Sequence, residues 1–108
     1  MLIVIKGPNC KVLRSSIIND ALSEKLPTWG VVNTVQGERL LTHTPEQWNE
    51  RVLLVLSANN DAEIVVSASY WKNHEVPSLD DISFYYGRFV EILLAHYRDR
   101  ISSIEISI

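Results

Sequence analysis

The sequence predicts a single α+β domain, with helices packed on one mixed or antiparallel sheet. Its 108 residues are enough for one hydrophobic core. Short apolar runs of strand length alternate with longer stretches of helical period. In chain order they read strand-helix-strand-strand-helix-strand, followed by one more helix and strand. The first six elements match the ferredoxin-like split arrangement, so the last helix and strand are expected as an addition to it.

The first half of the chain supplies four of these elements. Residues 2–5 form a continuous apolar run, which is typical of a strand buried on both faces. Asn9 is expected to cap a helix that continues to about Leu26, where a following proline ends it. Residues 29–35 and 39–42 then read as two short strands joined by a tight turn.

A second helix is expected directly after Thr44. Threonine is a good cap, Pro45 suits the first helical position, and Gln47 can complete a capping box. The helix would end at Asn59. Its inner face would bury Trp48, Val52, Leu53, Val55 and Leu56.

The second half ends in a strand, a long helix and a last strand. Residues 63–71 alternate between two faces, as a strand does. Residues 77–100 form an amphipathic helix with Ser78 as its cap. Phe84 lies off the apolar stripe of this helix, either beneath a loop or exposed as an anchor for a partner. The residues from Ile104 to Ile108 alternate isoleucine with polar residues and predict a half-buried strand.

The charge of the chain is distributed unevenly. The formal net charge is −3, and residues 42–108 contain ten acidic and five basic side chains. An acidic balance disfavours nucleic acid, because affinity for phosphates comes largely from Lys and Arg. It favours a basic protein partner through charge complementarity. The other interpretation is that the acids simply keep a small domain in solution.

The cytoplasm is the expected location. The lone Cys10 cannot form an internal disulfide, so the fold does not depend on oxidation. No apolar run approaches the roughly 20 residues needed to span a bilayer, so no membrane association is expected. The N-terminal stretch lacks the basic region and cleavage site of a signal peptide.

A polar loop separates two pairs of aromatic residues. Tyr70 and Trp71 end a strand, and Phe84 and Tyr85 lie early in the long helix. If the loop folds back, aromatics and acids form one patch with the anatomy of a protein interface. The alternative is that Tyr70 and Trp71 are core residues at a strand end. The predicted partner-binding residues are Trp71, Glu75, Asp80, Asp81, Phe84 and Tyr85.

The leading hypothesis from the sequence is a small acidic protein-binding domain without enzymatic activity. In its most concrete form it is an inhibitor, an immunity-type protein or antitoxin that neutralises a basic partner such as a nuclease toxin. Its acids would stand in for phosphates, and its aromatics would fill a pocket of the partner. No cofactor is expected.

The alternative is a small nucleotide- or anion-binding domain, or an enzyme, that uses the first strand-to-helix turn. Free amides at a helix N-terminus attract anions. The turn lacks the second glycine and the hydroxyl of a phosphate loop. Cys10 could act as a nucleophile beside a histidine, but nothing brings any of the three histidines to it. The candidate residues are Lys6, Gly7, Asn9, Cys10 and Lys11.

Other site types receive less support. His74-Glu75 and Asp80-Asp81 come nearest to a metal site but lack a metal-ligand spacing, so no metal is predicted. The expected central strands carry no aromatic for stacking on RNA bases. A third hypothesis is a homodimer in which residues 104–108 pair, as an exposed edge, with a second copy.

Overall fold

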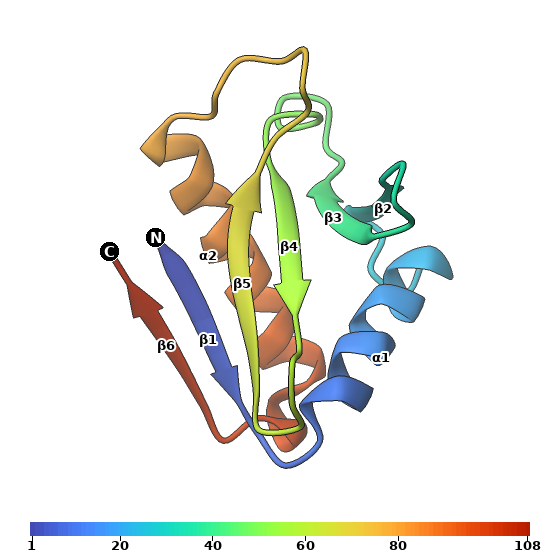
Figure 1. The fold of residues 1–108 in the computed structure, drawn as a ribbon, viewed down its shortest axis with the longest axis vertical. Coiled ribbons are helices and arrows are strands. Elements are labelled where there is room, and N and C mark those ends of the chain that lie inside the picture. Colours follow the sequence, from blue (N-terminus) through green and yellow to red (C-terminus); the bar gives the residue numbers. More distant parts are fainter.

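A six-stranded antiparallel sheet forms the centre of the molecule. The computed structural model describes residues 1–108, and its strand order is β2-β3-β4-β5-β1-β6 (Figure 1). Every neighbouring pair is antiparallel. The α+β class expected from the sequence is therefore confirmed. The strands are β1 (Leu2–Lys6), β2 (Trp29–Asn33), β3 (Arg39–His43), β4 (Leu53–Ser57), β5 (Glu63–Ser69) and β6 (Ser103–Ser107).

Two helices cover one face of this sheet. They are α1 (Cys10–Leu22) and α2 (Leu79–His96), and a short 3-10 helix, η1 (Arg98–Arg100), follows α2. The core lies between the helices and the sheet, where alternate residues of the central strands point inward. The largest fully buried members are Tyr85, Phe89, Ile3, Ile5, Leu13, Ile17, Leu41, Leu54, Ile64 and Leu93.

The helix expected after Thr44 is absent, and this prediction was wrong. The amides of Trp48 and Asn49 both bond to the Pro45 carbonyl, at 2.8 and 2.9 Å, so the capping signal produces turns only. The chain then enters β4, whose five residues pair with β5. A short apolar run fits a buried strand as well as a helix, and here pairing with β5 decides between them.

The element order therefore differs from the ferredoxin-like arrangement expected from the sequence. It is β-α-β-β-β-β-α-β, with the 3-10 turn before the last strand. The other expected elements are present with shifted ends. The first helix ends at Leu22 instead of about Leu26, and the long helix expected over residues 77–100 ends at His96, before η1.

The long helix begins as its sequence predicts. The Ser78 hydroxyl accepts a hydrogen bond from the Asp81 amide at 3.1 Å, and the Asp81 carboxylate accepts one from the Ser78 amide at 3.4 Å. This reciprocal capping box satisfies two amides that a helix start otherwise leaves free. It also fixes the direction in which the preceding loop approaches α2.

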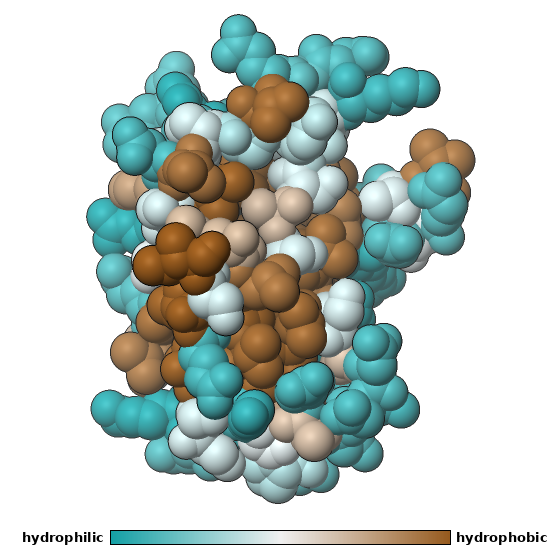
Figure 2. Space-filling model, turned by 60° about the vertical axis from the view of Figure 1, so that its left-hand side comes forward, coloured by the Kyte–Doolittle hydropathy of each residue, from teal (hydrophilic) through white to brown (hydrophobic).

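No helix lies over the other face of the sheet. Apolar side chains gather on the side of the molecule that Figure 2 shows. On the uncovered face Leu2 is 41% exposed, and Val4, Val55 and Val65 are half-buried. Ile106 of the edge strand β6 is 54% exposed, but it pairs with the core residue Ile3 and therefore lies on the helix-covered face. On the uncovered face β6 carries Glu105 and Ser107, opposite Val4 and Leu2, so the apolar surface ends at this polar edge strand.

Candidate protein-binding surface at one end of the sheet

The turn between Thr44 and Val52 packs against the first half of α2. Tyr85 holds it there, because its hydroxyl donates to the Trp48 carbonyl and lies 3.3 Å from the Thr42 hydroxyl. Tyr85 is fully buried, so these bonds form away from water. Buried hydroxyls need such partners, and the turn supplies them with its backbone. As a result, residues 45–51 and the N-terminal part of α2 form one surface.

A stacked aromatic pair stands at the centre of this surface. The rings of Trp48 and Phe84 lie parallel, with centroids 3.6 Å apart and an interplanar angle of 11°. The Arg88 guanidinium lies 5.2 Å from the Phe84 ring, and that of Arg51 lies 5.4 Å from the Trp48 ring. Both rings are half-buried. Two cations over partly exposed rings are typical of cation–π contacts.

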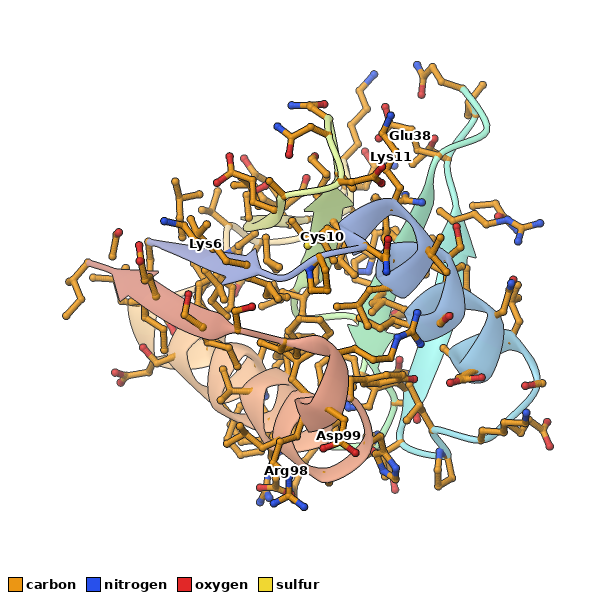
Figure 3. All side chains as sticks on the ribbon, turned by 90° about the horizontal axis from the view of Figure 1, so that it is seen from below. Lys6, Cys10, Lys11, Glu38, Arg98 and Asp99 are labelled. Atoms are coloured by element: carbon orange, nitrogen blue, oxygen red, sulfur yellow. The ribbon has the colours of Figure 1, made fainter.

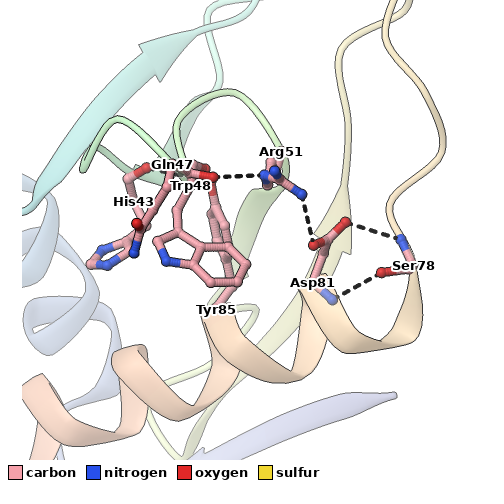
Figure 4. Close-up of polar contacts among 7 residues, drawn as sticks. All are labelled: His43, Gln47, Trp48, Arg51, Ser78, Asp81 and Tyr85. Atoms are coloured by element: carbon pink, nitrogen blue, oxygen red, sulfur yellow. Dashed lines mark hydrogen bonds and ion pairs between the residues drawn. The ribbon is translucent and has the colours of Figure 1, made fainter.

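Arg51 joins the aromatic pair to the start of α2 (Figure 4). Its Nε donates to the Gln47 carbonyl at 2.8 Å, and its Nη1 lies 3.2 Å from Asp81 Oδ1. Asp81 in turn belongs to the capping box with Ser78. The surface is thus held by contacts between two segments, residues 47–51 and residues 78–81, that are far apart in the sequence.

An acidic groove continues from Asp81. It encloses about 290 Å³ and is lined by Glu50, Arg51, His74, Glu75, Val76, Pro77 and Asp81. The His74 Nε2 lies 3.4 Å from Glu50 Oε2 across it. With three carboxylates and one arginine, the lining carries a net negative charge. Asp80 is exposed beside Asp81 and adds to the negative charge.

A second cavity, which we call the aromatic niche, lies on the other side of the stacked pair. It encloses about 280 Å³ and is lined by Thr28, Trp29, His43, Pro45, Gln47, Trp48, Phe84, Arg88, Glu91 and Ile92. Two buried polar atoms here have no hydrogen-bond partner, the Nδ1 of His43 and the Nε1 of Trp48. Buried polar atoms without a partner are uncommon in proteins.

His43 is held neutral in the niche. Burial lowers the pKa of the ring below its usual value, and the positive charge of Arg88 acts in the same direction. The Thr28 carbonyl and the Glu91 carboxylate oppose this shift without reversing it. The ring forms no hydrogen bond of standard geometry with Thr28, so we take burial as the deciding cause.

The predicted partner-binding residues do not all lie on this surface. Glu75 lines the groove, Asp80 is exposed, and Phe84 is half-buried in the niche. Trp71 is half-buried, with its ring centroid 5.4 Å from that of His74. Asp81 is occupied by Ser78 and Arg51.

Tyr85 is a correction to the predicted surface. Its side chain has no exposed area. It acts from beneath the surface, by holding the turn.

Sequence reasoning missed the contribution of the turn. Trp48, Glu50 and Arg51 were expected on a helix, with Trp48 on its inner face, and His43 was not expected at any site. The available signal was the run of five apolar residues from Val52 to Leu56, which is short enough for a strand. A strand there would have left residues 45–51 as a turn with surface side chains.

The predicted anion-binding turn is filled by the protein itself. The Cys10 amide bonds to the Asp61 carbonyl at 2.9 Å, and a Cβ on Gly7 would lie 2.6 Å from the Arg100 carbonyl. The Lys6 ammonium lies 3.5 Å from Glu105. Asn9 is exposed just before the helix and makes no side-chain cap. This turn does not form the open cradle of amides that the alternative hypothesis requires.

Cys10 is a core residue. Burial raises the pKa of its thiol, and the charges of Asp61 and Glu63 add to the rise, while a contact with the Gly7 carbonyl opposes it. The Sγ atom lies 3.8 Å from the Ile5 carbonyl oxygen and 3.7 Å from that of Gly7. Figure 3 shows Cys10 within the molecule, between the outward-pointing Lys6 and Lys11. A protonated, enclosed thiol is a poor nucleophile.

Comparisons with known proteins do not place the chain in a family. No protein-family model, no curated protein and no solved structure matches it. Neither helix combines the length and apolar character that crossing a membrane would require. No group of three or more His, Cys, Asp or Glu side chains is arranged to hold a metal ion.

Proposed function

We propose that this chain is a protein-binding domain that captures a basic protein through the acidic groove and the adjoining aromatic niche. The observation that carries the proposal is the contact between the two. The Trp48–Phe84 stack is joined through Arg51 and Asp81 to a groove lined by carboxylates. Half-buried aromatics beside a charged rim are the arrangement in which interface hot spots occur.

The unpaired indole N–H of Trp48 gives further support. This buried donor has no partner within the chain. A partner oxygen would satisfy this donor if the side chains that cover it in the niche moved aside on binding, and the complex would then be stabilised. Aromatic residues with such a polar group are common at the centres of protein interfaces.

The most specific form of the proposal is an inhibitor of the immunity or antitoxin type. Carboxylates that face outward would occupy the basic site where a nuclease toxin holds phosphates. Their charge would also accelerate encounter with such a partner. The chain would act by binding alone, in the cytoplasm, and it would perform no reaction of its own.

Charge reversal on the groove tests the proposal. The full chain is immobilised and exposed to an extract of its source organism, and the retained protein is identified and purified. Glu75→Lys and Asp80→Lys are suitable variants because both side chains are exposed and form no hydrogen bond or ion pair within the chain. We expect one basic protein in stoichiometric amount, whose affinity falls about tenfold or more in each variant.

A matched control uses an acid in η1, just beyond the far end of α2. Asp99→Lys makes the same change in net charge about 27 Å of helix away. It is expected to leave the affinity unchanged. Equal affinity for all three variants and the unaltered chain would refute the proposed site, and failure to retain any basic protein would refute the proposed function.

The nuclease form of the proposal has its own measurement. The captured protein is assayed for cleavage of RNA and DNA with and without the chain. We expect one equivalent of the unaltered chain to abolish cleavage. One equivalent of the Asp80→Lys variant should leave the captured protein able to cleave. A captured protein without nuclease activity would leave basic-protein binding standing and overturn the nuclease-inhibitor form.

A further inference from the structure

A different cavity, at the opposite end of the sheet, collects positive charge. It encloses about 430 Å³ and is lined by Lys11, Arg14, Ser15, Glu38, Arg39, Leu40, Val55, Leu56, Ser57, Ala58 and Asn59. It forms because β3 and β4 pair at one position only, Leu41 with Leu54. Beyond that pair the two strands diverge, and the first turns of α1 lie beside the gap (Figure 1).

Three cations without acidic partners converge on this cavity. Lys11, Arg14 and Arg39 line it, although the chain as a whole has a net charge of −3. The five ion pairs of the molecule all involve other residues. Glu38 is the only acid of the lining, and Figure 3 shows it beside Lys11. The cavity therefore has a local balance of two positive charges.

Arg14 is held in a fixed position. Its Nε donates to the Leu56 carbonyl at 2.6 Å, at a point where β3 no longer pairs with β4. Its side chain is half-buried, and the two terminal nitrogens of the guanidinium form no hydrogen bond with the protein. A guanidinium anchored through one nitrogen presents the remaining donors in a fork that matches a phosphate.

We propose that this cavity binds a small phosphomonoester. Arg14, Lys11 and Arg39 would hold the phosphate, with the hydroxyls of Ser15 and Ser57 as further donors. Glu38 would accept a hydrogen bond from a hydroxyl or amine of the organic part, which a bare phosphate ion lacks. The volume lies in the range of sites for small organic ligands and exceeds the needs of a phosphate ion alone. The acidic remainder of the surface disfavours a long polyanion such as RNA.

Calorimetry on the full chain in a phosphate-free buffer at low salt tests the proposal. The probes are ribose 5-phosphate, adenosine 5′-monophosphate, adenosine, inorganic phosphate and a single-stranded RNA. We expect at least one of the two phosphomonoesters to bind, with an affinity that falls as salt is added. Adenosine should not bind, and inorganic phosphate should bind more weakly than the ester.

Two sets of variants locate the binding. Lys11→Gln combined with Arg39→Gln removes two exposed cations that form no contact on which the fold depends. Arg14→Gln removes the anchored one. Each is expected to weaken ester binding about tenfold or more. The matched control Arg98→Gln alters an exposed arginine of η1 and should leave binding unchanged.

Each remaining outcome counts against the proposal. Absence of binding by both esters overturns it, as does equal binding by the double variant and the unaltered chain. Inorganic phosphate that binds as well as the esters indicates an adventitious ion only. RNA that binds more tightly than the esters points to a nucleic-acid surface instead. None of these results depends on the acidic groove, so the two proposals fail or stand separately.

Discussion

At Gly7 the chain has no space for a side chain. A Cβ there would lie 2.6 Å from the carbonyl oxygen of Arg100, which belongs to the backbone and cannot rotate away. The close approach also brings the Ser102 amide to the Lys6 carbonyl, at 2.7 Å. The glycine that suggested a phosphate-binding turn therefore serves the docking of the C-terminal segment onto β1.

Gly7→Ala is expected to destabilise the protein by about 1–3 kcal/mol, because the segment from η1 to β6 must shift. Urea unfolding measures the change. Gly87→Ala is the matched control, since nothing lies within 4 Å of a Cβ at this helical position. The control should raise stability by up to about 1 kcal/mol through helix propensity. Equal effects of the two variants would contradict the role given to Gly7.

His43 makes stability depend on pH. Burial lowers the pKa of the folded ring below the unfolded value of 6.5, so the unfolded chain binds more protons between the two values. The stability that the neutral His43 ring contributes is therefore fully present above pH 6.5. It is lost as the pH falls from 6.5 towards the lower pKa of the folded ring. The unfolding free energy then changes by at most about 1.4 kcal/mol per pH unit because of this one group.

The variant His43→Phe is expected to flatten this slope, because it removes the titrating group and keeps an aromatic ring against Trp29. Unfolding free energies from pH 7 down to pH 5 measure it. His96→Gln, at an exposed position, should keep the slope of the unaltered chain. If His43→Phe keeps it too, another group causes the pH dependence.

At the scale of elements, one hydrogen bond joins the two helices. The Tyr97 hydroxyl, at the end of α2, donates to Asp20 Oδ2 of α1 at 2.7 Å. Burial raises the pKa of Tyr97, and the neighbouring carboxylate adds to the rise. The phenol therefore stays protonated and remains a donor. This bond supplements the apolar contacts that hold both helices on the sheet.

Tyr97→Phe keeps the ring and removes only the donor. We expect a loss of about 1.5–3 kcal/mol in unfolding free energy, which is typical of a hydrogen bond to a charged group. In an Asp20→Asn background the same change should cost less. A double-mutant cycle measures the difference as a coupling energy. Additive losses in the cycle would show that the two side chains do not interact.

The turn at residues 45–51 illustrates how elements create the candidate site. Its local signals, Thr44 and Pro45, are those of a helix start, and they produce turns because β4 takes the following residues. Tyr85 then holds the turn from below. No pattern within residues 45–51 indicates that a tyrosine 37 residues after Trp48 bonds to their backbone.

At the scale of the whole molecule, the sheet ends on the open strand β6. Its isoleucines, Ile104 and Ile106, lie on the helix-covered face beside Ile5 and Ile3, and Glu105 on the other face is offset by Lys6 at 3.5 Å. Such an edge is a template for pairing with another strand. The homodimer hypothesis from the sequence therefore stays open as a prediction.

We expect sedimentation to show a dimer whose population rises with protein concentration. Ile106→Lys should keep the chain monomeric, since an edge lysine opposes strand pairing. Leu22→Lys, at an exposed site on α1, is the control and should leave the association unchanged. A monomer at every concentration, or an unaffected Ile106→Lys variant, would exclude pairing through β6.

The sequence by itself determined the elements whose signals are local. The apolar run of β1, the reciprocal cap at Ser78 and the alternation of β5 depend on neighbouring residues only. The tertiary structure alone decided the state of residues 52–57, because a continuous apolar run has no period and its hydrogen-bond partners lie in β5. It likewise brought Trp48 to Phe84 and Arg14 to Arg39. Those juxtapositions arise from strand order and strand divergence, which are properties of the sheet and not of any one segment.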